Sequence, residues 1–400
     1  MNKKLMAVAV AGALAAPAAV FAQASNVQIY GKLNLGLDNY SATGSTAGAA
    51  GDFKSRYRVY DSSSRLGFRG TENLGGGLNA VFLMESGVAV DTGAATSQNG
   101  GASSSAGILS SRLGHVGLQG GWGLFTFGKS NVWWTSGTQD LAEALWVNVG
   151  GPGISTGTFG RGMAVGVTRV SNTMQYTSPV MGGMNAVVSY SPNRQEPVQA
   201  NANADGKLWG VTLQGTWGQF AGGLDWVKDQ ANSPAVGSQK ATTGTKLRGG
   251  WTYRPGASVN LLWVRSKLTN GGAAPIQGGV VDATASSLQQ DGWIINWDHL
   301  FGNVRALAQW GKMNNITGCQ IAGACNNTNM TGYFVGANYL FSKRTWMYLT
   351  YGQIRNASNY NQDYIGSGLT AATGPGPGGL GVASLGADPR LVAIGMIHNF

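Results

Sequence analysis

Charged residues are scarce in this chain: Asp, Glu, Lys and Arg make up 11% of its 400 residues, against about 25% in an average soluble domain. Long apolar runs are scarce as well. Beyond the first 22 residues, no segment approaches the roughly 18 consecutive apolar residues that a membrane-spanning helix needs, and amphipathic helix patterns are missing. These absences exclude a helical membrane protein.

Cysteine and histidine are also few, with two and three residues respectively. Cys319 and Cys325 lie close together in a loop-like segment, where a local disulfide would form in an oxidising compartment. Two free thiols or a metal pair are the alternatives. The three histidines, His115, His299 and His398, are too scattered to complete a metal site. We therefore assign no metal and no cofactor.

Motifs for nucleic-acid binding, nucleotide binding and catalysis are weak. The net charge is +10, but no Lys/Arg-rich run concentrates it, so we expect no nucleic-acid partner. Residues 376–381 match G-x-G-x-x-G, yet they contain Pro377 and precede no helix pattern, which excludes nucleotide binding. Each histidine falls on a separate predicted strand, so we predict that the chain is not an enzyme.

The N-terminal segment has the three parts of a secretory signal. Lys3 and Lys4 precede an apolar, Ala-rich run that reaches Phe21, and the run ends in a small-x-small pattern at Ala22. We expect cleavage after Ala22, with Ala24 as the alternative site. The chain then divides into a signal peptide, 1–22, and a mature domain, 23–400.

Alternating apolar and polar residues recur along the mature chain, as in β-strands. In the segment 27–38, Val27 and Ile29 share one face, whereas Lys32 and Asp38 share the other. Short turns are predicted near 72–77, 120–123, 179–183, 218–219, 254–256, 301–303 and 342–344. Long polar loops are predicted near 41–54, 91–107, 132–164, 193–206, 232–244, 271–288, 314–329 and 358–388. Seven turns and eight loops join sixteen strands.

A closed transmembrane barrel explains this pattern together with the 64 glycines and the 43% of hydrophobic residues. Each strand would show an apolar stripe to lipid and a polar stripe to water, and closure would leave no backbone group unpaired in hydrocarbon. Trp122, Trp133, Trp251, Trp346 and Tyr348 lie near predicted strand ends, where interfacial girdles would use them. A large soluble β-sandwich array is the rival class.

Several motifs resemble those of the Gram-negative general porins, and most closely the porins of beta-proteobacteria. They are SRLGFRGTENLGGGL at 64–78, SRLGHVGL at 111–118, WGLFTFGK at 122–129, RVSNTMQYTSP at 169–179, YLFSKRT at 339–345 and GMIHNF at 395–400. Phe400 resembles the C-terminal signal that the outer-membrane assembly machinery reads. The likeness covers essentially the whole mature chain in the expected order.

The resemblance implies an all-β fold: a sixteen-stranded antiparallel transmembrane β-barrel with short periplasmic turns, long external loops and a third loop folded inward. It also implies a homotrimer in the Gram-negative outer membrane, in contact with outer-membrane lipid and lipopolysaccharide. The expected function is passive diffusion of small hydrophilic solutes and ions. A channel dedicated to one substrate, or a structural or adhesive barrel that does not conduct, are the alternatives.

Family members line one wall of the pore constriction with basic residues, and by motif position these correspond to Lys32, Arg65, Arg112 and Arg169. We call these four residues the basic wall. Arginine keeps its charge at working pH, so the basic wall would attract anions. These side chains could instead pair with carboxylates and serve only structure.

The opposing loop departs from the enterobacterial pattern of the family. Residues 149–161 contain no acidic residue, and the nearest carboxylates are Asp140 and Glu143. We name these two residues as the possible acids of the constriction loop, and we expect a stronger anion preference because the opposing acids are few.

Overall fold

A computed structural model describes the parts of the chain whose placement is defined. These are residues 26–62, 64–88, 90–91, 109–133, 169–192, 207–230, 241–269, 282, 284–363 and 384–400. Within these ranges the only helix is a single 3₁₀ turn, η1 (Gly48–Ala50). None of the helices in the described ranges has the length and apolar character needed to cross a membrane.

Seventeen strand segments make up one antiparallel sheet. They are β1 (Asn26–Thr43), β2 (Phe53–Asp61), β3 (Arg65–Gly75), β4 (Leu78–Gly87), β5 (Leu113–Gly120), β6 (Gly123–Asn131), β7 (Arg169–Thr177), β8 (Met184–Ser191), β9 (Lys207–Trp217), β10 (Phe220–Gln230), β11 (Ala241–Arg254), β12 (Ala257–Thr269), β13 (Ser287–Phe301), β14 (Val304–Met313), β15 (Met330–Leu340), β16 (Thr345–Asn356) and β17 (Asp388–Asn399). Segments β2 and β3 lie in line along β1, where Leu35 pairs with Asp61 and Lys32 pairs with Arg65. Counted as one strand, they give the sixteen strands that the sequence predicted.

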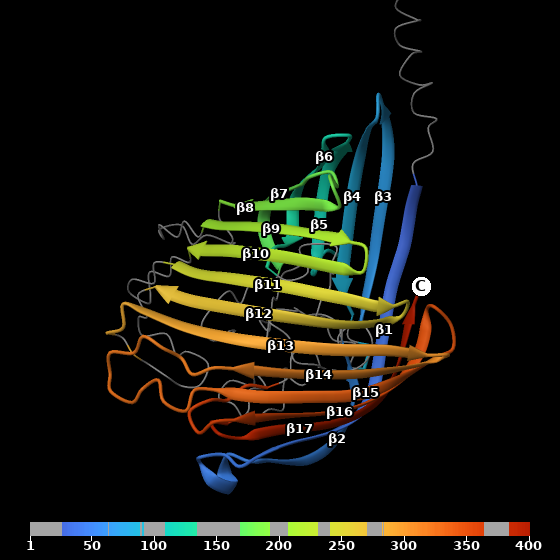
Figure 1. The fold of residues 1–400 in the computed structure, drawn as a ribbon. Helices are drawn as coiled ribbons and strands as arrows, with labels where there is room; N and C mark the ends of the chain where they lie inside the picture. The colour runs from blue at the N-terminus through green and yellow to red at the C-terminus, as the bar shows by residue number, and fades with distance from the viewer. Residues whose placement is uncertain are drawn as a thin grey trace, which may run out of the picture.

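The sheet closes on itself, because β17 pairs with β1 from Asn399 opposite Lys32 to Asp388 opposite Thr43. Gly31 and Phe400 complete the seam with two backbone hydrogen bonds, each 3.1 Å long. A Cβ on Gly31 would lie 2.3 Å from Cζ of Phe400, so glycine leaves room for the terminal ring. Figure 1 shows β9–β14 crossing the front of the barrel, with short turns at one end and loops at the other.

The seven predicted short turns all join consecutive strands, as between β11 and β12, where Gly256 adopts a φ of +76°. The loop boundaries were less accurate. Strand β1 continues to Thr43, β11 begins at Ala241 and β13 begins at Ser287, all inside segments predicted as loops. These strand ends are rich in Ser, Thr and Ala, which resemble loop composition although their backbones still pair with the neighbouring strand.

Side chains on β1 alternate between the two faces of the sheet as the sequence predicted. Val27 and Ile29 point outward and are exposed, whereas Lys32, Asn34 and Asp38 point inward and are buried. A shift of one residue would move the charged set into lipid, so the register is strongly constrained.

The inner face is not polar throughout, and on this point the barrel differs from the simple expectation. On β12–β15 several inward side chains are apolar and buried in one cluster, among them Leu262, Ile294, Leu307 and Phe334. Trp133 and Tyr348 also lie in this cluster and Trp346 packs against it, so the assignment of these three residues to an interfacial girdle was wrong. Period-two alternation predicts which residues point inward, but it does not predict whether they face water or pack against other side chains. In this barrel, packed side chains fill part of the interior.

Two loops on the long-loop side are held together by the carboxylate of Asp282. Its Oδ1 accepts hydrogen bonds from the backbone N–H of Thr284 and of Ala285 and from the Thr284 hydroxyl. Its Oδ2 accepts from the backbone N–H of Gln320, at 2.6 Å, and of Ile321, at 3.0 Å. Through these five hydrogen bonds, Asp282 connects the loop before β13 to the loop between β14 and β15.

Protonation of Asp282 should release the loop at 314–329. The Ile321 N–H, together with the Thr284 hydroxyl, holds the pKa of Asp282 at about 2, below its ordinary 3.8. A carboxylate whose pKa is lowered in the folded state stabilises that state at pH values above its unfolded pKa. This stability is lost as the pH falls through the folded pKa. We therefore expect pepsin to cleave 314–329 increasingly between about pH 4 and about pH 2, as measured by peptide mass spectrometry.

Asp282→Asn provides the control for this experiment. An amide can accept fewer of these hydrogen bonds and does not titrate here, so the variant should be cleaved already at the higher pH and show no step. Cleavage of the wild-type loop that does not change with pH would contradict the role given to Asp282.

Candidate functional site

The four residues of the basic wall come from four neighbouring regions of the barrel and lie on its inner side. Lys32 is on β1, Arg65 begins β3, Arg112 directly precedes β5 and Arg169 begins β7. Lys32 and Arg112 are buried, whereas Arg65 and Arg169 are partly exposed. Electrostatic interactions connect Lys32 and Arg169 with both Arg65 and Arg112. The structure thus brings these positions, distant in sequence, into one cluster.

Glu85 on β4 lies between two of these arginines, and sequence reasoning missed it. Its Oε1 accepts a 2.8 Å hydrogen bond from Nε of Arg112, and its Oε2 lies 3.5 Å from Nε of Arg65. The Tyr30 hydroxyl donates to the same Oε2 at 3.1 Å. Glu85 is the one charged residue of β4, and an isolated carboxylate in an apolar strand was the signal that could have revealed it.

Positive charge nevertheless exceeds negative charge in this cluster. A second carboxylate, Asp61, interacts electrostatically with Lys32 but also accepts a hydrogen bond from the backbone N–H of Ser64. Lys129 on β6, another residue that the sequence did not single out, donates to the Ser111 carbonyl at 2.8 Å and interacts electrostatically with Arg169. Asp91 also interacts electrostatically with Asp61. Among the residues that the structure describes, five cations therefore face three carboxylates, and a carboxylate can neutralise only one cation at a time.

The wall formed by β9–β11 carries a different balance of charge. Arg248 and Asp225 form an ion pair, with Nε and Oδ2 2.8 Å apart. Thr212 donates to the other carboxylate oxygen of Asp225 at 2.7 Å. Both charged groups are almost fully buried, so this wall offers the pore a neutralised pair, whereas the basic wall keeps an excess of positive charge.

The chain leaves β6 by turning into the barrel. A Cβ added to Gly210 of β9 would lie 2.4 Å from Cγ1 of Val132. A Cβ added to Gly244 of β11 would lie 2.5 Å from the ring of Trp133, so both side chains pack directly against these glycines. Lys246 donates to the Trp133 carbonyl, and its Nζ sits 4.5 Å from the centre of the indole ring. Because β9 and β11 are three and five strands away from β6, these contacts reach across the interior.

The possible constriction acids, Asp140 and Glu143, lie outside the described residues, as do 149–161. Cys319 and Cys325 form a disulfide within the loop between β14 and β15. Phe400 follows β17 and closes the seam with β1, and its ring stacks on His398 with 6.3 Å between ring centres. No cluster of metal-ligating side chains occurs in the parts of the chain that the structure describes.

A protein-family model described as Gram-negative porin matches residues 7–359. The chain belongs to the Gram-negative porin family. This porin is 26% identical to the major outer membrane protein P.IB of Neisseria lactamica over 385 residues, which cover 93% of this chain and 97% of that protein. It is 33% identical to outer membrane porin protein 32 of Delftia acidovorans over 205 residues, covering 50% and 52% of the two chains. A P.IB protein of Neisseria gonorrhoeae is 30% identical over 228 residues, or 56% and 57% of the two chains.

Solved structures share the fold. An anion-selective porin from Comamonas acidovorans superposes with a TM-score of 0.71 at 21% identity, covering 94% of this chain and all of that one. The trimer form of OmpT from Vibrio cholerae has a TM-score of 0.60 at 14% identity, with coverage of 94% and 100%. The family and its outer-membrane relatives place this porin in the Gram-negative outer membrane.

Gly244→Ala should destabilise the porin, because the added methyl would meet the Trp133 ring. Overpacking of this kind costs about 1–3 kcal/mol. Gly249→Ala is a matched control on the same strand, because a Cβ there has nothing within 4 Å. Urea unfolding of the two variants in detergent compares them directly, and equal midpoints would contradict tight packing of Trp133 at Gly244.

Proposed function

We propose that this porin is a general diffusion channel for small hydrophilic solutes that passes anions more readily than cations. The observation that carries the proposal is the excess of positive charge at the basic wall, where Glu85 is shared between Arg65 and Arg112. The name of the similar Comamonas acidovorans structure, an anion-selective porin, supports the same preference.

The physical reason for anion preference is the field inside a narrow aqueous path. Guanidinium groups stay charged at all working pH values, and walls of low dielectric constant focus their field into the water that remains. An anion that enters gains favourable interactions with Arg65 and Arg169, which are partly exposed, whereas a cation is repelled. The neutralised pair Asp225–Arg248 on the other wall adds little to oppose this bias.

We further propose that the porin works as a homotrimer and carries no enzymatic activity. The trimer form of OmpT supports the first statement, and membership of a family of channels supports the second. Residues 153–157 read G-I-S-T-G, which matches a nucleophile motif by its letters. That motif requires the strand-to-helix turn of an α/β fold, whereas the described residues form an all-β barrel.

Neutralising part of the basic wall should reduce the preference for anions. In a planar bilayer under a KCl gradient, we expect the wild type to show conductance in groups of three steps and a chloride-selective reversal potential. Arg65→Gln combined with Arg169→Gln should lower the ratio of chloride to potassium permeability by at least about threefold, since charged clefts change local counter-ion concentration by roughly tenfold or more. Glu85→Gln should raise that ratio.

Arg254→Gln is the matched control, because Arg254 is exposed at the turn between β11 and β12 and lies away from the basic wall. It should leave the reversal potential unchanged. A cation-selective wild type would refute the assignment of the basic wall, and a well-folded wild type that carries no current would refute the channel itself.

Export should remove the first 22 residues, because Lys3, Lys4 and the apolar run to Phe21 form a signal peptide. The intact mass of the porin purified from outer membranes should correspond to a chain that begins at Gln23. A mass that includes Met1 would contradict this assignment, and one that begins at Ser25 would move the cleavage site to Ala24.

A further inference from the structure

The chain turns into the barrel directly after β16. We call residues 357–363 the strap. Tyr360 is 1% exposed, and it belongs to the cluster of buried side chains that includes Leu391 of β17. Gln362 and Asp363 are buried as well. The strap is polar in sequence, as an external loop would be, yet it packs against the inner side of the wall.

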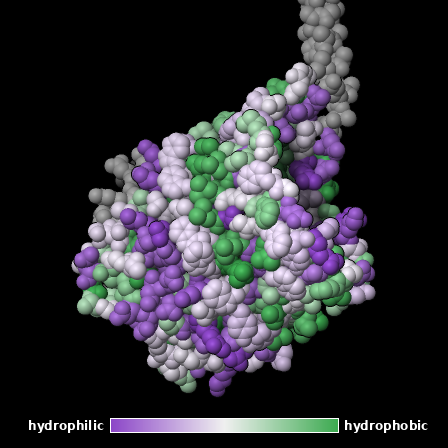
Figure 2. Space-filling model, viewed as in Figure 1, coloured by the Kyte–Doolittle hydropathy of each residue, from purple (hydrophilic) through white to green (hydrophobic). Residues whose placement is uncertain are grey.

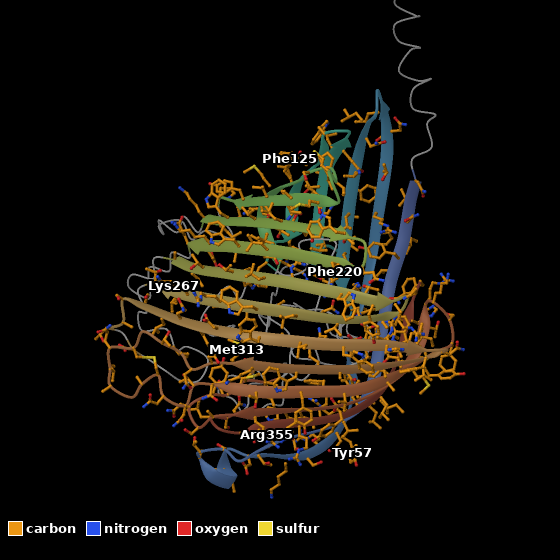
Figure 3. The ribbon with its side chains drawn as sticks, in the orientation of Figure 1. Tyr57, Phe125, Phe220, Lys267, Met313 and Arg355 are labelled. Carbon is orange, nitrogen blue, oxygen red and sulfur yellow. A yellow bond between two sulfur atoms is a disulfide. The ribbon has the colours of Figure 1, made fainter. Side chains whose placement is uncertain are left out.

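The strap lies at the mouth of the barrel on the side of the long loops. Figure 2 shows hydrophilic residues toward the ends of the visible face and apolar residues across its middle, so both mouths stand in water. Figure 3 labels Met313, which ends β14 and belongs to the same buried cluster, and Arg355, which lies just before the strap. Strands β14 and β16 both lead from a short turn to a long loop, so this is the external mouth.

Two hydrogen bonds anchor the strap to the two ends of one sector of the wall. The Tyr360 hydroxyl donates to Oε1 of Gln290 on β13, at 3.2 Å. The Tyr40 hydroxyl on β1 donates to Oδ2 of Asp363, at 2.7 Å. Strands β14–β17 lie between β13 and β1, and at about 4.8 Å per strand the anchors are roughly 24 Å apart along the wall. Because the wall is curved, a segment tied at both ends of this arc crosses the interior and takes up part of its cross-section.

A folded neighbouring loop also holds the strap. The backbone N–H of Asn359 donates to the Asn327 carbonyl at 3.0 Å, and its side-chain amide donates to the Asn326 carbonyl at 2.9 Å. Both carbonyls belong to the loop between β14 and β15, which a disulfide closes. Gln290 donates from Nε2 to the Thr328 carbonyl of the same loop, at 3.1 Å. The strap is therefore part of a hydrogen-bonded assembly of loops and wall.

The strap and the basic wall lie at different depths of the channel. Tyr40, which holds Asp363, is eight residues from Lys32 on β1. Eight residues of an antiparallel strand span about 27 Å, and a strand tilt of about 35–45° leaves roughly 20 Å of this along the barrel axis. Mobile ions screen charges beyond about 8–10 Å. The strap can therefore narrow the path of a solute without changing the field at the basic wall.

We propose that the strap is a second constriction of this porin, which limits the size of solutes at the external mouth, whereas the basic wall sets the preference for charge. Tyr360 is its positioning residue, because it supplies both the buried ring and one of the two anchors. Neutral sugars are the class of solute that the strap sorts, since their passage depends on pore diameter and hydrogen bonding and not on a net charge. The proposal rests on the diffusion channel proposed for this porin and names its size-selective element.

Swelling of liposomes that contain the refolded mature porin tests the strap. The probes are glucose, sucrose and raffinose, which are neutral sugars of increasing size. Tyr360→Ala removes the ring and the hydroxyl that hold the strap. The swelling rate in raffinose relative to glucose should therefore rise by at least about threefold, since the passage of neutral solutes depends on pore diameter. Tyr40→Phe combined with Tyr360→Phe removes only the two hydroxyls and should raise the same ratio to a smaller extent.

Tyr339→Ala is the matched control, because Tyr339 is half exposed on the outer face of β15 near the short turn to β16. It should leave the sugar ratio unchanged. In a KCl gradient, both strap variants should keep the reversal potential of the wild type. All variants should also keep the heat-modifiable gel mobility of a folded barrel.

A sugar ratio that is unchanged in Tyr360→Ala, or raised equally in Tyr339→Ala, would overturn the role of the strap. A shifted reversal potential without a change in the sugar ratio would overturn it as well. A raised ratio in a porin without anion preference would refute the basic wall and leave the strap standing. No swelling by the wild type or by any variant would refute the diffusion channel and the strap together.

Discussion

The constraint on which the whole structure depends is that every backbone N–H and C=O within hydrocarbon must be paired. Strand β17 meets this constraint by pairing with β1, and Gly31 and Phe400 close the last gap. Closure fixes which side of each strand is inside, so a simple alternation in the sequence becomes a division between pore and lipid. Lys32 lies inside and Ile29 outside for this reason alone.

The interior that closure creates is divided by chemistry. Among the described residues, the sector from β1 to β7 holds more cations than carboxylates on its inner side, and Glu85 connects two of its arginines. Another sector, from β12 to β15, is lined by side chains such as Leu262 and Phe334, which are buried with Trp133. Charged side chains therefore gather on one side of the interior, while packed apolar side chains fill part of the other side.

The sequence was sufficient for the features that depend on local rules. The turn at Gly256 could be predicted because glycine readily adopts the positive φ that this chain reversal uses. The inward position of Lys32 follows from the alternation of apolar and polar residues along β1. Features that depend on contacts across the barrel were missed. Trp133 has the position of an interfacial residue in the sequence, yet Gly244, five strands away, leaves space for its ring. Glu85 lies outside the motifs that singled out its arginine partners, so no spacing rule pointed to it.

The net charge of +10 is divided between two populations of basic residues, because closure of the barrel places some of them inside and others outside. Arg112 is buried among inward side chains, where its charge acts through a medium that screens it weakly. Lys267 is exposed on the outer face, where mobile ions screen charges beyond about 8–10 Å. The inner population can bias which ions pass, whereas the outer population can act only on anions that come into contact with it. A single number for net charge therefore hides two populations of basic residues, and only the direction in which each side chain points tells them apart.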